Sequence, residues 1–115
     1  MGYVRAIEAS LAPGDHTTVE ARGWDLLVVN VDGDYLVVEN RCTHAKAELS
    51  KGRLDGSEIT CAEHGARFDL RSGACVGPPA TKSVPKFDAR VKDGFVEVKI
   101  DKIKVAPRPQ FGPMN

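Results

Sequence analysis

The feature that most constrains this chain is a concentration of cysteine and histidine in its middle. The sequence holds three cysteines and three histidines, and four of these six residues fall within positions 42–64. They are arranged as Cys42-x-His44, sixteen intervening residues, and Cys61-x-x-His64. Thiols and imidazoles are soft or borderline donors that suit zinc or an iron–sulfur cluster. The spacing therefore predicts two short loops that converge on one metal centre.

The cysteine count and the charge limit the compartment and the partners. Three cysteines are too few for a disulfide scaffold, and in a reducing cytoplasm clustered cysteines indicate metal binding. The first residues lack the layout of a secretory signal, and no stretch approaches the roughly 18 apolar residues that cross a bilayer. Sixteen basic and sixteen acidic residues argue against a nucleic-acid partner. We therefore expect a cytoplasmic protein with neither a membrane nor a nucleic-acid partner.

The rest of the sequence predicts an all-β domain. Residues 24–31 form an apolar run rich in β-branched side chains, which favours a strand buried on both faces. Residues 87–91 and 96–100 alternate apolar and polar around the turn Asp93-Gly94, as antiparallel strands do over a core. No long segment has a helical period. We expect one domain over residues 1–100 and an extended or mobile tail over 101–115, which contains three prolines.

Zinc is the generic alternative for this ligand set. Structural zinc sites usually keep a pair of cysteines apart from a pair of histidines, with two to five residues inside each pair. Each half of the present motif instead mixes one thiol with one imidazole. A structural zinc module that serves as an interaction domain is the alternative that the ligand types leave open.

The spacing and its surroundings resemble one known family. Residues 42–77 resemble the cluster-binding segment of Rieske proteins, whose motif is C-x-H…C-x-x-H. Residues 61–69, CAEHGARFD, are similar to the C-P-x-H-G-x-x-F-D run of soluble Rieske ferredoxins, with Ala62 where a proline is common. Residues 77–80, GPPA, resemble the proline loop that covers the cluster in this family. The strand pattern extends the likeness to residues 1–100.

The resemblance implies a fold, a cofactor and its ligands. The fold is an antiparallel Rieske-type β-sandwich with a small cluster-binding subdomain at about residues 40–80, made of two ligand loops and the proline loop. The cofactor is one [2Fe–2S] cluster per chain, held by two cysteines on one iron and two histidines on the other. Carried over to this sequence, Cys42 and Cys61 hold the inner iron, and His44 and His64 hold the outer iron nearer to solvent.

Four positions bear on the reduction potential. Ala47 and Glu63 stand where the Rieske proteins of respiratory and photosynthetic complexes carry two cysteines that form a disulfide. Ala66 and Phe68 stand where those proteins carry a serine and a tyrosine whose hydroxyls bond to sulfur. Hydrogen bonds to sulfur stabilise the added electron, so their loss predicts a centre near the low end of the Rieske range, about −150 mV.

With these four differences, the sequence resembles the ferredoxins of multicomponent aromatic-ring dioxygenases. Such a protein takes one electron from a flavin-containing ferredoxin reductase and passes it to a terminal Rieske oxygenase. The sequence has no G-x-G-x-x-G for a nucleotide cofactor, and we expect no catalysis by the chain alone. The Rieske small subunit of another oxidoreductase, of nitrite-reductase type, is the alternative. An apolar docking rim around the histidines is predicted at Ala45, Ala47, Gly65, Ala66, Pro78 and Pro79.

Two residues lie outside this constellation. His16 follows a turn, and we interpret it as a solvated side chain. Cys75 is the third cysteine, and we interpret it as a small apolar side chain that packs in the core.

Overall fold

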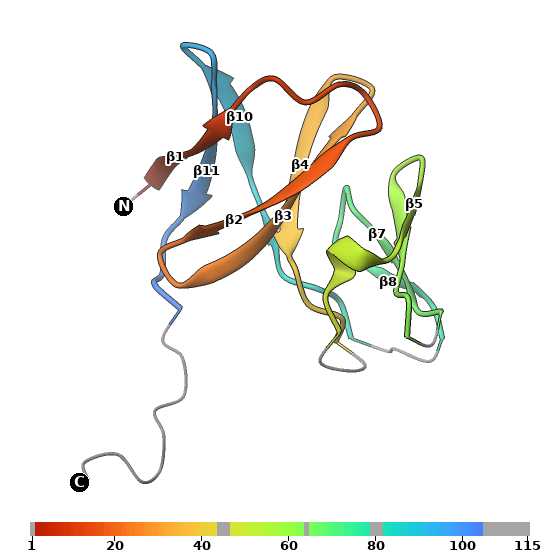
Figure 1. The fold of residues 1–115 in the computed structure, drawn as a ribbon. Helices are drawn as coiled ribbons and strands as arrows, with labels where there is room; N and C mark the ends of the chain where they lie inside the picture. Colours follow the sequence, from red (N-terminus) through yellow and green to blue (C-terminus); the bar gives the residue numbers. More distant parts are fainter. Residues whose placement is uncertain (1, 44–46, 64, 79–81, 105–115) are drawn as a thin grey trace, which may run out of the picture.

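The regular secondary structure of the described residues is almost entirely antiparallel strand (Figure 1). The computed structural model describes residues 2–43, 47–63, 65–78 and 82–104. Within these ranges the helical content is the single 3₁₀ turn η1 (Leu49–Lys51), so the prediction of an all-β fold is confirmed. The same ranges contain no helix that is both long and apolar enough to cross a membrane.

The strands make three sheets in the described part of the chain, and Figure 1 shows the third (green) beside the other two. The first sheet, in the order β1–β11–β10, consists of β1 (Gly2–Glu8), β11 (Phe95–Ile100) and β10 (Ala89–Lys92). The second consists of β2 (His16–Ala21), β3 (Trp24–Val31), β4 (Asp34–Glu39) and β9 (Lys86–Phe87). The third consists of β5 (Arg53–Asp55), β6 (Glu58–Thr60), β7 (Arg67–Asp69) and β8 (Cys75–Gly77).

Strand β3 separates two hydrophobic cores. Its side chains alternate, so Leu26 and Val28 enter a core shared with the first sheet, which supplies Val96, Val98 and Ile100. Leu27, Val29 and Val31 enter a second core shared with the third sheet. The prediction of a strand buried on both faces over residues 24–31 is therefore confirmed, and the second core is the one that holds Cys42 and Cys61.

The segment after β11 is attached to the body of the domain. The Trp24 indole Nε1–H donates to the Lys102 carbonyl at 2.9 Å, and the Lys104 N–H donates to the Arg22 carbonyl at 2.9 Å. The Lys104 ammonium forms an ion pair with Glu39, at the end of β4. The first residues of the tail predicted over 101–115 are therefore bonded to the sandwich through Lys102 and Lys104, and residues 105–115 lie outside the described part.

We predict that Gly23→Ala destabilises the fold more than Gly94→Ala. Both glycines follow a residue of positive φ in a hairpin turn and have nearly the same φ, +83° and +80°. A Cβ on Gly94 meets open space, whereas a Cβ on Gly23 overlaps the Lys104 carbonyl oxygen. Each alanine costs about 1–2 kcal/mol for the left-handed backbone, and the overlap adds about 1 kcal/mol or more for Gly23→Ala. Unfolding midpoints measured side by side check this, and equal shifts for the two variants contradict it.

Candidate metal centre

The first ligand loop begins directly after β4. Cys42 is three residues beyond the end of the strand and is only 1% exposed. Its backbone N–H donates to the carbonyl of Ala47, five residues later, at 2.8 Å. This bond joins the two ends of a short loop. The predicted ligand His44 lies outside the described residues, as do residues 45 and 46.

The second loop repeats this construction after β6. Cys61 is one residue beyond the strand and is 2% exposed. Its N–H donates to the carbonyl of Ala66, again five residues later, at 2.7 Å, and its own carbonyl accepts from the Gly65 N–H at 3.1 Å. The predicted ligand His64 falls inside this closed loop and lies outside the described residues. In both segments, therefore, the cysteine N–H bonds to the carbonyl five residues later.

Both cysteines lie in the same buried core. Cys42 and Cys61 belong to one buried cluster with Leu27, Leu49 and Phe68 among its members. Two thiols in one apolar core, each at the base of a loop, are donors that suit a soft metal or an iron–sulfur cluster. Among the described residues, which leave out His44 and His64, no group of three or more His, Cys, Asp or Glu side chains is close enough to hold an ion.

A third segment completes the site. Strand β8 ends at Gly77, Pro78 is exposed, and residues 79–81 lie outside the described part. The chain returns at Lys82, whose carbonyl accepts a hydrogen bond from the Thr43 hydroxyl at 2.7 Å. Thr43 is the neighbour of Cys42, so the returning arm of the proline loop is bonded directly to the first ligand loop.

The comparisons with known proteins agree with this arrangement. Residues 2–88 match the family described as the Rieske [2Fe-2S] domain. The chain belongs to the Rieske [2Fe–2S] domain family. Its cofactor is therefore a [2Fe–2S] cluster, and the buried thiol pair fits a centre of this kind. The match favours this cluster over the structural zinc module.

Several Rieske ferredoxins are similar to the chain over nearly their whole length. It is 31% identical, over 86% of its length and 94% of the relative's, to the ferredoxin component of the naphthalene 1,2-dioxygenase system of Pseudomonas putida. It is 32% identical, over 76% and 85%, to the ferredoxin component of the naphthalene 1,2-dioxygenase/salicylate 5-hydroxylase systems of Ralstonia sp. Among solved structures, the ferredoxin of carbazole 1,9a-dioxygenase from Nocardioides aromaticivorans IC177 superposes with a TM-score of 0.80 at 32% identity, over 85% and 97% of the two chains. The predicted Rieske-type sandwich is thereby confirmed.

The predicted docking rim needs one correction. Ala66 is fully buried and cannot contact a partner. It precedes β7, and the period of two places its side chain on the same inward face as Phe68, which is also fully buried. Gly65 and Pro78 are exposed and Ala47 is half-buried, whereas Ala45 and Pro79 lie outside the described residues.

Ala47 and Glu63 lie beside a hollow in the surface. They line the same cavity of about 220 Å³, together with Glu48, Lys51 and Ala62. These are the two positions at which the high-potential Rieske proteins were expected to carry cysteines. The structure therefore leaves a polar cavity between the two loops at the place where the resemblance puts a disulfide in those proteins.

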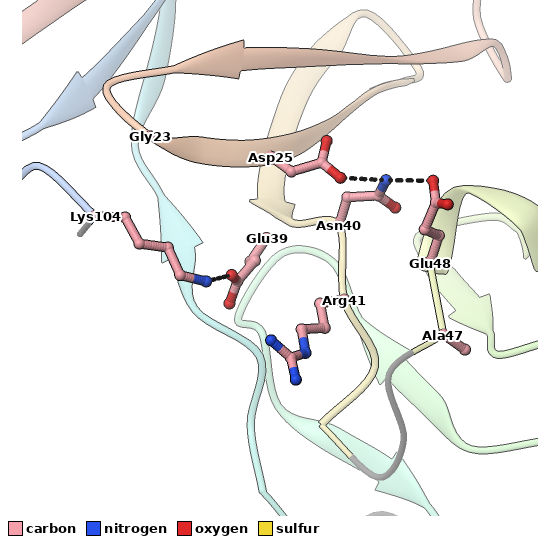
Figure 2. Close-up of a pocket in the computed structure, with 8 residues that line it drawn as sticks. All are labelled: Gly23, Asp25, Glu39, Asn40, Arg41, Ala47, Glu48 and Lys104. Atoms are coloured by element: carbon pink, nitrogen blue, oxygen red, sulfur yellow. Dashed lines mark hydrogen bonds and ion pairs between the residues drawn. The ribbon is translucent and has the colours of Figure 1, made fainter. Parts of the chain in front are cut away.

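Three residues beyond the motif contribute to the site or to its support. His16 is exposed, as expected, but its Nε2 lies 3.2 Å from the Ser50 carbonyl, so it also joins β2 to η1. Cys75 is half-buried against the second core, and its Sγ lies 3.4 Å from the Gly77 carbonyl. Asn40 belongs to the stretch, residues 40–44, that resembles the family's entry to the first ligand loop, but its buried amide at the base of this loop was not predicted (Figure 2). A polar residue at the end of a buried apolar strand is the signal that could have indicated it.

We predict that Thr43→Val accelerates loss of the bound metal. Valine keeps the shape of the side chain but leaves the Lys82 carbonyl without its donor. A hydrogen bond of this kind contributes a net 0.5–1.5 kcal/mol, roughly a two- to tenfold change in rate if the loops open before release. Iron transfer to a chelator measures the rate. Thr18→Val, at an exposed position on β2, is the control, and equal rates for the two variants contradict the prediction.

Proposed function

We propose that the chain is an electron-transfer ferredoxin of an aromatic-ring dioxygenase system. In this proposal its cluster carries one electron from a flavin-containing ferredoxin reductase to a terminal Rieske oxygenase. The observation that carries the proposal is the pair of buried cysteines at the bases of two matching loops, in a chain that spans 94% of a naphthalene dioxygenase ferredoxin component. A structure described as a complex of reduced oxygenase and oxidized ferredoxin in carbazole 1,9a-dioxygenase also contains a similar chain, at 33% identity and a TM-score of 0.80.

We assign the ligands as Cys42 and Cys61 on the inner iron and His44 and His64 on the outer iron. The burial of both cysteines supports the inner assignment, since their thiols lie in the core. The exposure of Glu63 and Gly65, which flank His64, supports an outward position for the second loop. A [2Fe–2S] cluster held in this way accepts and releases one electron. Imidazoles at the surface shorten the path to a docked partner.

The protein surroundings support a low reduction potential. Ala66 and Phe68 are fully buried in the core that contains both cysteines, and neither has a hydroxyl to donate to sulfur. The apolar side chains of this core exclude water from the thiol side of the site. Because donors to sulfur raise the potential of such centres, we propose a value near the low end of the Rieske range, about −150 mV.

The remaining parts of the proposal concern the whole chain. We propose that residues 1–100 act as one Rieske domain with its cluster-binding part at about 40–80, that residues 101–115 are an appendage, and that the protein works in the cytoplasm. We also propose that the chain catalyses no reaction alone. The absence of a nucleotide-binding G-x-G-x-x-G from the sequence supports the last point.

Three measurements test the proposal: the iron and sulfide content of the protein, its reduction potential, and its delivery of electrons to an oxygenase. The purified protein is expected to contain about two irons and two sulfides per chain, to titrate near −150 mV, and to restore oxygenase turnover when added to a reductase and a Rieske oxygenase. His64→Ala is expected to remove the cluster or change its spectrum, whereas His16→Ala leaves both unchanged. Stoichiometric zinc, or a normal Rieske spectrum in His64→Ala, contradicts the proposal.

A further inference from the structure

Asn40 lies at the base of the first ligand loop and is almost fully buried, at 3% exposed. It follows the last residue of β4 and precedes Cys42 by two positions. Its backbone N–H donates to the Asp25 carbonyl on β3 at 2.8 Å, which fixes the main chain as it leaves the sheet. The backbone from which its side chain extends is therefore fixed in position.

The carboxamide of Asn40 makes three further hydrogen bonds. Its Oδ1 accepts from the Ser50 backbone N–H at 2.7 Å. Its Nδ2 donates to Asp25 Oδ2 at 3.2 Å and to Glu48 Oε1 at 3.4 Å. Figure 2 shows this row, with the amide nitrogen between the two carboxylates. Asn40 thus joins β3, the far side of the loop and η1.

The bond to Ser50 closes the loop at its two ends. Residues 40–50 contain the whole first ligand loop, and inside this span the Cys42 N–H to Ala47 carbonyl bond closes it a second time. Ser50 belongs to η1, whose Leu49 is fully buried in the core that holds both cysteines. The thiol of Cys42 is therefore carried on a segment that is anchored on both sides.

The hydrogen bonds at this position match the chemistry of an amide. Its oxygen accepts from the Ser50 N–H, and its two donors, which are buried, are satisfied by the carboxylates of the exposed residues Asp25 and Glu48. Aspartate has the same shape but only acceptors, so it would place a third carboxylate against two others. Because an unsatisfied buried polar group is costly, the loop base specifies asparagine.

We propose that Asn40 is the positioning residue for the thiol of Cys42. The inference rests on the proposed role of Cys42 as a ligand. Partners outside the ligand shell orient ligands and control solvent access, and both set the potential and the affinity of a metal centre. Holding the two ends of the loop together keeps the sulfur in one place and water out of the loop base.

Asn40→Asp tests the proposal, since it changes donors into acceptors without changing shape. We expect release of iron to a chelator to be about tenfold faster or more, with a shifted reduction potential and an altered visible circular dichroism spectrum. The rescue is Asn40→Asp combined with Asp25→Asn and Glu48→Gln, which reverses every donor and acceptor of the row. This triple variant is expected to regain the wild-type potential and release rate.

Two controls separate positioning from general stability. Asp25→Asn with Glu48→Gln alone keeps acceptors for the Asn40 amide and loses only the exposed Lys51–Glu48 pair, so it is expected to behave as wild type. Gly94→Ala lowers stability far from the loop and is expected to leave the potential unchanged. An Asn40→Asp protein with wild-type potential and release rate overturns the proposal, and so does a triple variant no better than Asn40→Asp.

The outcomes also distinguish this proposal from the proposed function. If Asn40→Asp does not fold, the triple variant decides, and its failure to hold a cluster with wild-type potential overturns the role of Asn40. If the wild-type protein holds zinc, the proposed function fails. The role of Asn40 is then judged from hydrogen exchange of the Ser50 N–H, which speeds up in Asn40→Ala, where its acceptor is removed, if the side chain closes the loop and stays unchanged if it does not.

Discussion

The burial of two thiols in one apolar core is the constraint on which the rest of the structure depends. Cys42 and Cys61 come from two separate loops, yet both belong to the buried cluster that includes one face of β3. The alternation of β3 makes this possible, because its other face completes a separate core with β11. The domain therefore has one core that holds the sandwich together and another that gathers the thiols.

Several independent hydrogen bonds hold the loops of the site to this core. Each cysteine N–H closes its own loop to the fifth residue beyond it, and Asn40 closes the first loop again at its base. Thr43 bonds the first loop to the returning arm of the proline loop. An electron carrier gains from such rigidity, because a centre that moves little on reduction exchanges electrons with little reorganisation of its surroundings. The fold thus supplies order at the site.

Local sequence patterns predicted most strands and the candidate ligand loops, whereas features that depend on distant contacts were missed. The run over 24–31 and the hairpin at Asp93-Gly94 are periodic, so their strands are visible in the sequence. Strand β1 was missed because a bulge between Arg5 and Ile7 interrupts its alternation. The side chain of Asn40 bonds residues 8 to 15 positions away, and the bond from Trp24 to Lys102 spans 78 positions. No local pattern encodes such partners. The inward direction of Ala66 follows from its alternation with Phe68, which the docking-rim prediction overlooked.

Pulsed electron paramagnetic resonance of the reduced protein, labelled with ¹⁵N only in histidine, tests the central claim most directly. Coordination by two thiolates and two imidazoles predicts two strongly coupled histidine nitrogens in the wild-type chain, and the same two in His16→Ala. A reduced centre with no coupled histidine nitrogen, or with one, would contradict the assignment of two cysteines and two histidines to a single [2Fe–2S] cluster.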